Sequence, residues 1–166
     1  VAVVGSTAME QALKPSTDKP VPAVFFFGSE DPLINWGDGR GRSLGRYGAA
    51  KDGKDPGIGA ISPEFYALSR LGGWMSVSDT VAWWTAHNGA NNSPYSSYEP
   101  DRDPTDGTRV KKEVYGNRGR EVIVYTIEGG EHSWPGALAL PGMSRKTCQD
   151  VEASEIIWKF FKENSR

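Results

Sequence analysis

The chain has 166 residues, with 19 Lys and Arg against 21 Asp and Glu, which gives a formal net charge of −2 at pH 7. This length suits one domain, and so balanced a charge provides no positive field to attract nucleic acid or an anionic membrane surface. The longest apolar run, residues 23–27, is far shorter than the roughly 18 residues of a membrane-spanning helix, so we expect no nucleic-acid partner and no membrane span.

Two apolar runs near the start of the chain have the character of strands. Residues 1–4 are mostly β-branched and end at Gly5, which is typical of the end of a buried strand. Residues 21–27 are almost continuously apolar and lead into Gly28 and further turn-forming residues. This second run predicts a central parallel strand covered on both faces, and the glycine-rich residues 35–60 after it predict a long surface loop.

The remaining chain predicts two helices separated by strands. Residues 76–89 begin with a capping serine, carry spaced apolar positions and end in glycine, so they predict a helix. Residues 90–107 are turn formers. Polar and apolar residues alternate over 109–115, which predicts an exposed strand near the sheet edge, and residues 121–127 predict another covered strand. Residues 150–164 predict an amphipathic helix behind an aspartate cap, with Phe160 and Phe161 on its apolar side. Strands that alternate with helices indicate an α/β fold with a mostly parallel sheet and flanking helices.

An aspartate and a histidine each follow a predicted core strand. Asp31 comes shortly after the strand at 21–27, and His132 comes shortly after the strand at 121–127. Reactive groups gather at the carboxyl ends of parallel strands, where the loops converge. Two members of a catalytic triad are an acid that orients an imidazole and the imidazole itself, which takes a proton from a nucleophile. By themselves, Asp31 is also an ordinary turn former before proline and His132 an ordinary loop histidine.

Four sequence blocks resemble a known enzyme family. They are residues 22–34 (PAVFFFGSEDPLI), 76–89 (SVSDTVAWWTAHNG), 124–136 (VYTIEGGEHSWPG) and 153–161 (ASEIIWKFF). Together they resemble successive blocks of the polyhydroxybutyrate depolymerase and feruloyl esterase group of α/β-hydrolases. The resemblance implies that His132 is the catalytic histidine, that Asp31 is its orienting acid, and that residues 1–166 form a single, partial α/β-hydrolase domain.

The same resemblance implies that part of the catalytic machinery lies elsewhere. It places the nucleophile elbow and the oxyanion-hole loop before Val1, so the expected partner is a missing N-terminal half or a partner chain. Gly41 to Gly45 match GxSxG literally, but they follow Asp31 and no apolar strand precedes them, so we interpret the match as chance. Ala90 and the turn at 116–119 stand where the family commonly has paired cysteines. The family is secreted or periplasmic, but this chain by itself does not determine its compartment.

The resemblance implies a serine carboxylic-ester hydrolase without a cofactor, acting on a small-molecule or polymeric ester. Trp36 and Trp134 lie in predicted loops and are the candidate substrate contacts, whereas Trp158 is expected to pack within its helix. One cysteine, Cys148, and two histidines provide no metal-ligand spacing. The alternative hypothesis is a non-catalytic α/β module that binds a polymer or glycan through its loop tryptophans.

Overall fold

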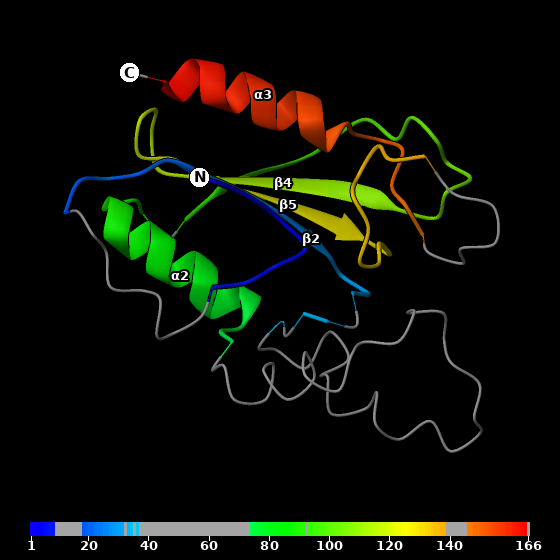
Figure 1. Cartoon of the computed structure of the whole chain (residues 1–166), viewed down its shortest axis with the longest axis horizontal. Coiled ribbons are helices and arrows are strands. Elements are labelled where there is room, and N and C mark those ends of the chain that lie inside the picture. Colours follow the sequence, from blue (N-terminus) through cyan, green and yellow to red (C-terminus); the bar gives the residue numbers. More distant parts are fainter. Residues whose placement is uncertain are drawn as a thin grey trace.

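The computed structural model describes residues 1–8, 18–31, 33–34, 36, 74–91, 93–138 and 146–165. Within them, five strands and two helices follow one another along the chain, and the helices lie on opposite faces of the sheet (Figure 1). In chain order they are β1 (Ala2–Val4), β2 (Ala23–Gly28), α2 (Val77–Asn88), β3 (Tyr95–Tyr98), β4 (Arg109–Tyr115), β5 (Val122–Glu128) and α3 (Ala153–Asn164).

The sheet is mixed, so the prediction of a mostly parallel, α/β-hydrolase-like sheet is wrong. Its strand order is β1-β2-β5-β4-β3. The pairs β1–β2 and β2–β5 are parallel, whereas β5–β4 and β4–β3 are antiparallel. The predicted parallel strand near residues 21–27 is present as β2, but β5 holds the central place.

Two features of the chain explain the antiparallel half of the sheet. Only residues 116–121 separate β4 from β5, which is too short for a parallel crossover, so the two strands form a hairpin. Strand β3 lies within the segment predicted to contain turns alone. Its sequence, Tyr-Ser-Ser-Tyr, lacks an apolar run because the strand lies at the sheet edge and is largely exposed.

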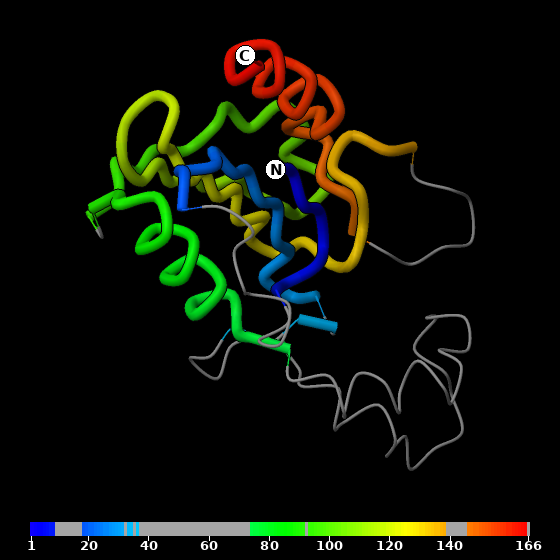
Figure 2. The backbone as a smooth tube through the Cα atoms, turned by 60° about the vertical axis from the view of Figure 1, so that its left-hand side comes forward, coloured from blue at the N-terminus to red at the C-terminus, as the bar shows by residue number. Residues whose placement is uncertain are grey.

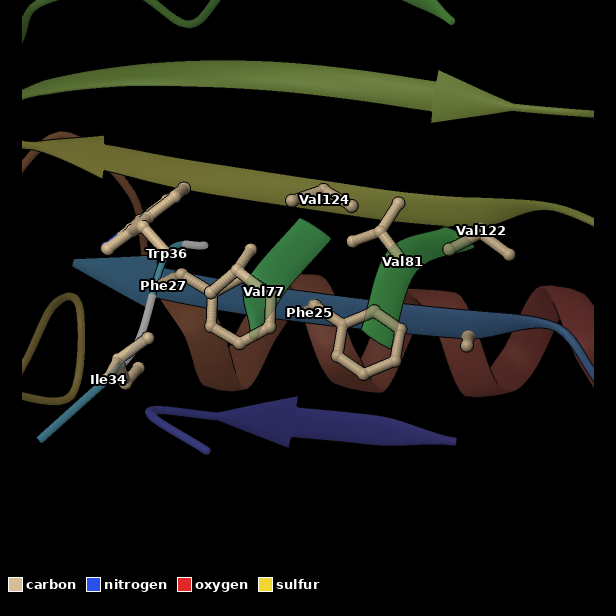
Figure 3. Close-up of a cluster of buried hydrophobic side chains, with 9 residues drawn as sticks. Phe25, Phe27, Ile34, Trp36, Val77, Val81, Val122 and Val124 are labelled. Atoms are coloured by element: carbon tan, nitrogen blue, oxygen red, sulfur yellow. The ribbon is translucent and has the colours of Figure 1, made fainter. Parts of the chain in front are cut away.

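A hydrophobic cluster fills the space between α2 and the sheet (Figure 3). Alternate residues of β2, Phe25 and Phe27, point toward α2 and meet Val77 and Val81. Helix α2 begins at the predicted cap, since Ser76 Oγ accepts a hydrogen bond from Asp79 N at 3.0 Å, and it ends at Gly89 with a φ of +61°.

Helix α3 covers the other face of the sheet (Figure 2). A second cluster of buried side chains lies under it. Val24, Phe26 and Ile127 from the sheet meet Phe160 from the helix. The cap of α3 differs from the prediction: Glu152 occupies the N-cap without a side-chain cap hydrogen bond, while Asp150 Oδ1 accepts from the backbone N–H groups of Arg102 and Asp103. Phe161 also differs, since 43% of it is exposed.

Hydrogen bonds and close packing join the end of α2 to the segments that precede β2 and β5. Asn88 is fully buried; its Oδ1 accepts from Val21 N at 2.9 Å, and its Nδ2 donates to the carbonyls of Val21 and Arg120. Beside it, a Cβ added to Gly116 would lie 2.8 Å from the Cβ of Ala90. The segment after α2 and the turn before β5 therefore meet at Ala90 and Gly116.

Candidate active site

The turns after β2 and β5 are held together at one rim of the sheet. Ser29 N donates to Ile127 O at 2.9 Å, and Gly129 N donates to Ser29 Oγ at 2.8 Å. Glu30 N donates to Gly130 O at 2.9 Å. Because β2 and β5 are parallel neighbours, their carboxyl ends emerge side by side, and these bonds fix the two turns relative to each other.

Asp31 and His132 meet above this rim. His132 Nδ1 lies 2.8 Å from Asp31 Oδ2, a hydrogen-bond distance, although the residues are 101 positions apart in sequence. The Asp31 side chain is fully buried, and its other oxygen accepts from Leu33 N at 2.8 Å. The His132 side chain is 38% exposed. The two predicted residues are therefore brought together, whereas their catalytic roles remain a prediction.

This geometry gives the two imidazole nitrogens different tasks. Nδ1 faces a carboxylate, and an ionised carboxylate only accepts hydrogen bonds, so Nδ1 carries the proton of the neutral ring. Nε2 is then the basic nitrogen, able to take a proton from another group and return it. The pair can thus act as a general base and then as a general acid.

Gly5 is a site residue that sequence reasoning missed. It has a φ of +64°, and a Cβ built on it would lie 3.0 Å from His132 Cε1 and 3.2 Å from Nδ1. The chain leaving β1 therefore passes directly against the imidazole, where only glycine leaves room for the ring. The available signal was a glycine placed immediately after a predicted strand.

Gly28 allows a similarly close approach between the two turns. A Cβ added there would lie 2.5 Å from Gly130 O and 2.6 Å from Glu131 O. A small cavity of about 10 Å³ beside this contact is lined by Gly5, Gly28 and Asp31 among others. That volume is about enough for one water molecule. The backbone around the pair is therefore closely packed.

The two predicted substrate tryptophans occupy different environments. Trp36 is only 7% exposed, packs edge-on against Phe27 at 6.2 Å and donates from Nε1 to Gly28 O at 3.2 Å (Figure 3). Trp134 is 45% exposed and donates from Nε1 to Ser154 Oγ at 3.1 Å. Trp36 thus belongs mainly to the core rather than to an open loop, while Trp134 presents aromatic surface near His132.

The sequence has further candidate features besides this pair. The match at Gly41 to Gly45 and most of the predicted loop at 35–60 fall outside the residues that the structure describes. Among the residues it does describe, no group of three or more His, Cys, Asp and Glu side chains could hold a metal ion. No helix in this part of the chain is long and apolar enough to cross a membrane. Cys148 is buried, and burial raises the pKa of its thiol.

The chain matches no protein-family model, no curated protein and no solved structure.

Proposed function

We propose that this chain supplies the acid and the histidine of a serine carboxylic-ester hydrolase, and that the nucleophilic serine comes from outside it. The single observation that carries the proposal is the 2.8 Å contact between His132 Nδ1 and the buried Asp31 carboxylate. The similarity of the surrounding blocks to depolymerases and feruloyl esterases supports an ester as substrate.

Each residue has a distinct task in the proposed reaction. The serine oxygen attacks the ester carbonyl while His132 Nε2 takes the hydroxyl proton. His132 then gives that proton to the leaving alcohol, and Asp31 stabilises the imidazolium that exists between the two transfers. A water molecule activated by His132 next releases the carboxylic acid from the acyl-enzyme. The reaction needs no cofactor.

The burial of the pair suits this chemistry. Asp31 has no exposed surface, so its carboxylate interacts with the imidazole with little screening by water. Leu33 N and the imidazole together engage both carboxylate oxygens, which fixes the plane of the carboxylate. His132 is partly exposed, so a substrate and a nucleophile from another polypeptide can reach it.

Hydrolysis of p-nitrophenyl acetate by the 166-residue chain tests the proposal. This activated ester reacts with imidazole itself, so we expect a slow rate above buffer that depends on His132. His132→Ala should abolish this excess rate and Asp31→Asn should reduce it. His87→Ala is the matched control, because it removes the other histidine, which stacks on Trp83 in α2, and should leave the rate unchanged. Equal rates in all variants would contradict the proposed chemistry.

A fluorophosphonate probe tests where the nucleophile resides. Such probes label activated serines, so the chain alone should remain unlabelled if the serine lies outside it. Labelling of Ser43 that is lost in His132→Ala would place the nucleophile within the chain and overturn that part of the proposal.

The exposure of Trp134 favours a second candidate function. With 45% of its surface open, Trp134 can stack on a polymer or glycan whether or not catalysis occurs. A non-catalytic binding module would retain adsorption to insoluble polyester or plant cell wall in Asp31→Ala and His132→Ala. It would lose adsorption in Trp134→Ala. Binding that instead depends on His132 would contradict this alternative.

A further inference from the structure

We propose that Lys146 is a positioning residue for His132, because it contacts both the turn that carries the histidine and the turn that carries the acid. The histidine turn comprises residues 129–133, and the acid turn comprises residues 29–31. Lys146 contacts the first through its backbone carbonyl and the second through its ammonium group. Its role in catalysis rests on the function proposed above, whereas its effect on the imidazole ring can be measured without catalysis.

The carbonyl oxygen of Lys146 accepts hydrogen bonds from both chain neighbours of His132. Glu131 N donates to it at 3.4 Å, and Ser133 Oγ donates to it at 3.1 Å. A carbonyl oxygen has two lone pairs, so it can accept both bonds, of which the one from Glu131 is the longer and weaker. The chain is therefore anchored on each side of the histidine to a residue outside the turn.

The ammonium group of Lys146 reaches the acid turn. Its Nζ lies 3.6 Å from Oε2 of Glu30, which directly precedes Asp31 in the chain. The two side chains of this ion pair are 47% and 55% exposed, so water screens the pair and it contributes little to the stability of the fold. A response of the His132 ring to the loss of this pair would therefore report a change in local geometry.

The segment 146–149 is itself fixed to the rest of the protein, and it runs alongside the chain that follows β5 (Figure 2). Gly136 N donates to Cys148 O at 2.8 Å, and Cys148 is buried in the cluster under α3. Gln149 N donates to Asp106 Oδ2 at 2.7 Å. This segment can therefore support the histidine turn instead of moving with it.

The histidine turn needs this support beyond its first two residues. The hydrogen bonds that join the two turns directly reach Gly129 and Gly130, and glycine restricts the following chain little. His132 lies two residues further, and its Nδ1 keeps the 2.8 Å contact with Asp31 only while the turns hold their spacing. Lys146 therefore supports the part of the turn that those bonds do not reach.

Nitrogen-15 NMR of the His132 ring in the 166-residue chain tests the proposal. Lys146→Met removes the ion pair to the acid turn, and Ser133→Ala removes the shorter bond to the Lys146 carbonyl. In each variant the fraction of neutral rings with the proton on Nδ1 should fall, because the Asp31 carboxylate is held less firmly against that nitrogen. The fraction should fall further in the double variant.

Three further variants separate positioning from a general loss of surface charge. Lys159→Met is the matched control, because Lys159 also pairs with a surface glutamate, Glu163 of α3, at 4.0 Å. It should leave the His132 signals unchanged. Glu30→Gln breaks the ion pair from its other side and should match Lys146→Met, whereas Lys146→Arg keeps the positive charge and should retain the signals of the unchanged protein. Thermal unfolding should be cooperative in every variant, with a midpoint close to that of the unchanged protein.

The ester rate distinguishes a failure of this inference from a failure of the proposed function. The His132-dependent rate should fall about two- to fivefold in Lys146→Met and should not change in Lys159→Met. If the unchanged protein has no such rate but its ring responds to Lys146→Met, the proposed function is wrong and the positioning role stands. If the ring signals stay the same in Lys146→Met, Ser133→Ala and the double variant, or change equally in Lys159→Met, the positioning role is wrong.

Discussion

Gly5 lies against the imidazole of His132, so closely that a Cβ on this glycine would be 3.0 Å from Cε1 of the ring. The contact joins the end of β1 to the turn after β5, although β2 separates the two strands in the sheet. Gly5 packs against the ring on the β1 side, and Asp31 contacts the ring through Nδ1. The hydrogen bond to Asp31 and the close packing against Gly5 therefore both help to position the imidazole.

Gly5→Ala should displace His132 from Asp31. The added methyl group meets the ring, and alanine at a φ of +64° adds backbone strain of about 1–2 kcal/mol. We expect a less stable protein in which the His132-dependent ester rate falls. Chemical unfolding and the p-nitrophenyl acetate assay measure the two effects.

Gly107→Ala separates the steric effect from the backbone strain. Gly107 has a φ of +71°, and a Cβ there would meet nothing within 4 Å. This variant should lose only the stability that backbone strain costs, less than Gly5→Ala loses, and keep the full ester rate. If Gly5→Ala and Gly107→Ala had the same ester rate, the close contact between Gly5 and His132 would have no role in positioning the ring.

Asp31→Ala should destabilise the fold as well as release the histidine. It leaves Leu33 N without its part-buried 2.8 Å acceptor, the carboxylate of the buried Asp31, which costs about 1–3 kcal/mol. Asp31→Asn should cost less, because an amide oxygen can still accept from Leu33 N. Urea unfolding measures both variants, and equal stability of Asp31→Ala and the unchanged protein would contradict the buried hydrogen bond.

Asn88→Ala should be destabilising at a site far from the chemistry. The substitution removes three part-buried hydrogen bonds that tie the end of α2 to Val21 and Arg120, and the backbone groups of these two residues lose those partners. We expect a loss of about 1–3 kcal/mol in the free energy of unfolding. Asn164→Ala, at the end of α3, is the control and should stay within about 0.5 kcal/mol of the unchanged protein.

The buried phenol of Tyr125 should make the folded protein less stable at alkaline pH. Burial raises its pKa, and nearby Lys112 opposes part of this effect. The folded state therefore holds the phenol proton more tightly than the unfolded state. The stabilising contribution is complete below the unfolded pKa of about 10 and is lost as pH rises through the folded pKa.

Thermal unfolding across this alkaline range checks the sign of the effect. Tyr125→Phe should flatten the decline in stability above about pH 10, since phenylalanine has no proton to lose. Tyr95→Phe, at a tyrosine that is 74% exposed, should leave the decline unchanged. Identical curves for the two variants would mean that the burial of Tyr125 does not control alkaline stability.

The sequence predicted the elements that contain strong local signals. Ser76 and Gly89 bound α2 as their types suggested, and the apolar runs at β2 and β5 form adjacent parallel strands. Because parallel neighbours end at the same rim, the placement of Asp31 and His132 after these strands also predicted their meeting. The histidine's orientation was not predictable, because it depends on Gly5 from a third strand.

The remaining errors involve tertiary context. Strand β3 has few apolar residues because it lies at an exposed edge, so periodicity gave no signal for it. The alternation of strands and helices favoured a mostly parallel sheet, whereas the short connection between β4 and β5 makes these two strands antiparallel. Trp36 follows a turn but packs into the core, and Phe161 belongs to an apolar helical pattern but remains exposed. Local pattern does not specify which neighbours cover a side chain.

Nitrogen-15 NMR of the His132 ring tests the central claim most directly, because it identifies which ring nitrogen carries the proton. The account predicts a neutral imidazole with its proton on Nδ1 and none on Nε2. It also predicts that Asp31→Asn reverses this assignment, since the amide nitrogen would then face Nδ1 as a donor. A proton on Nε2 in the unchanged protein, or the same tautomer in Asp31→Asn, would contradict the proposed roles of both residues.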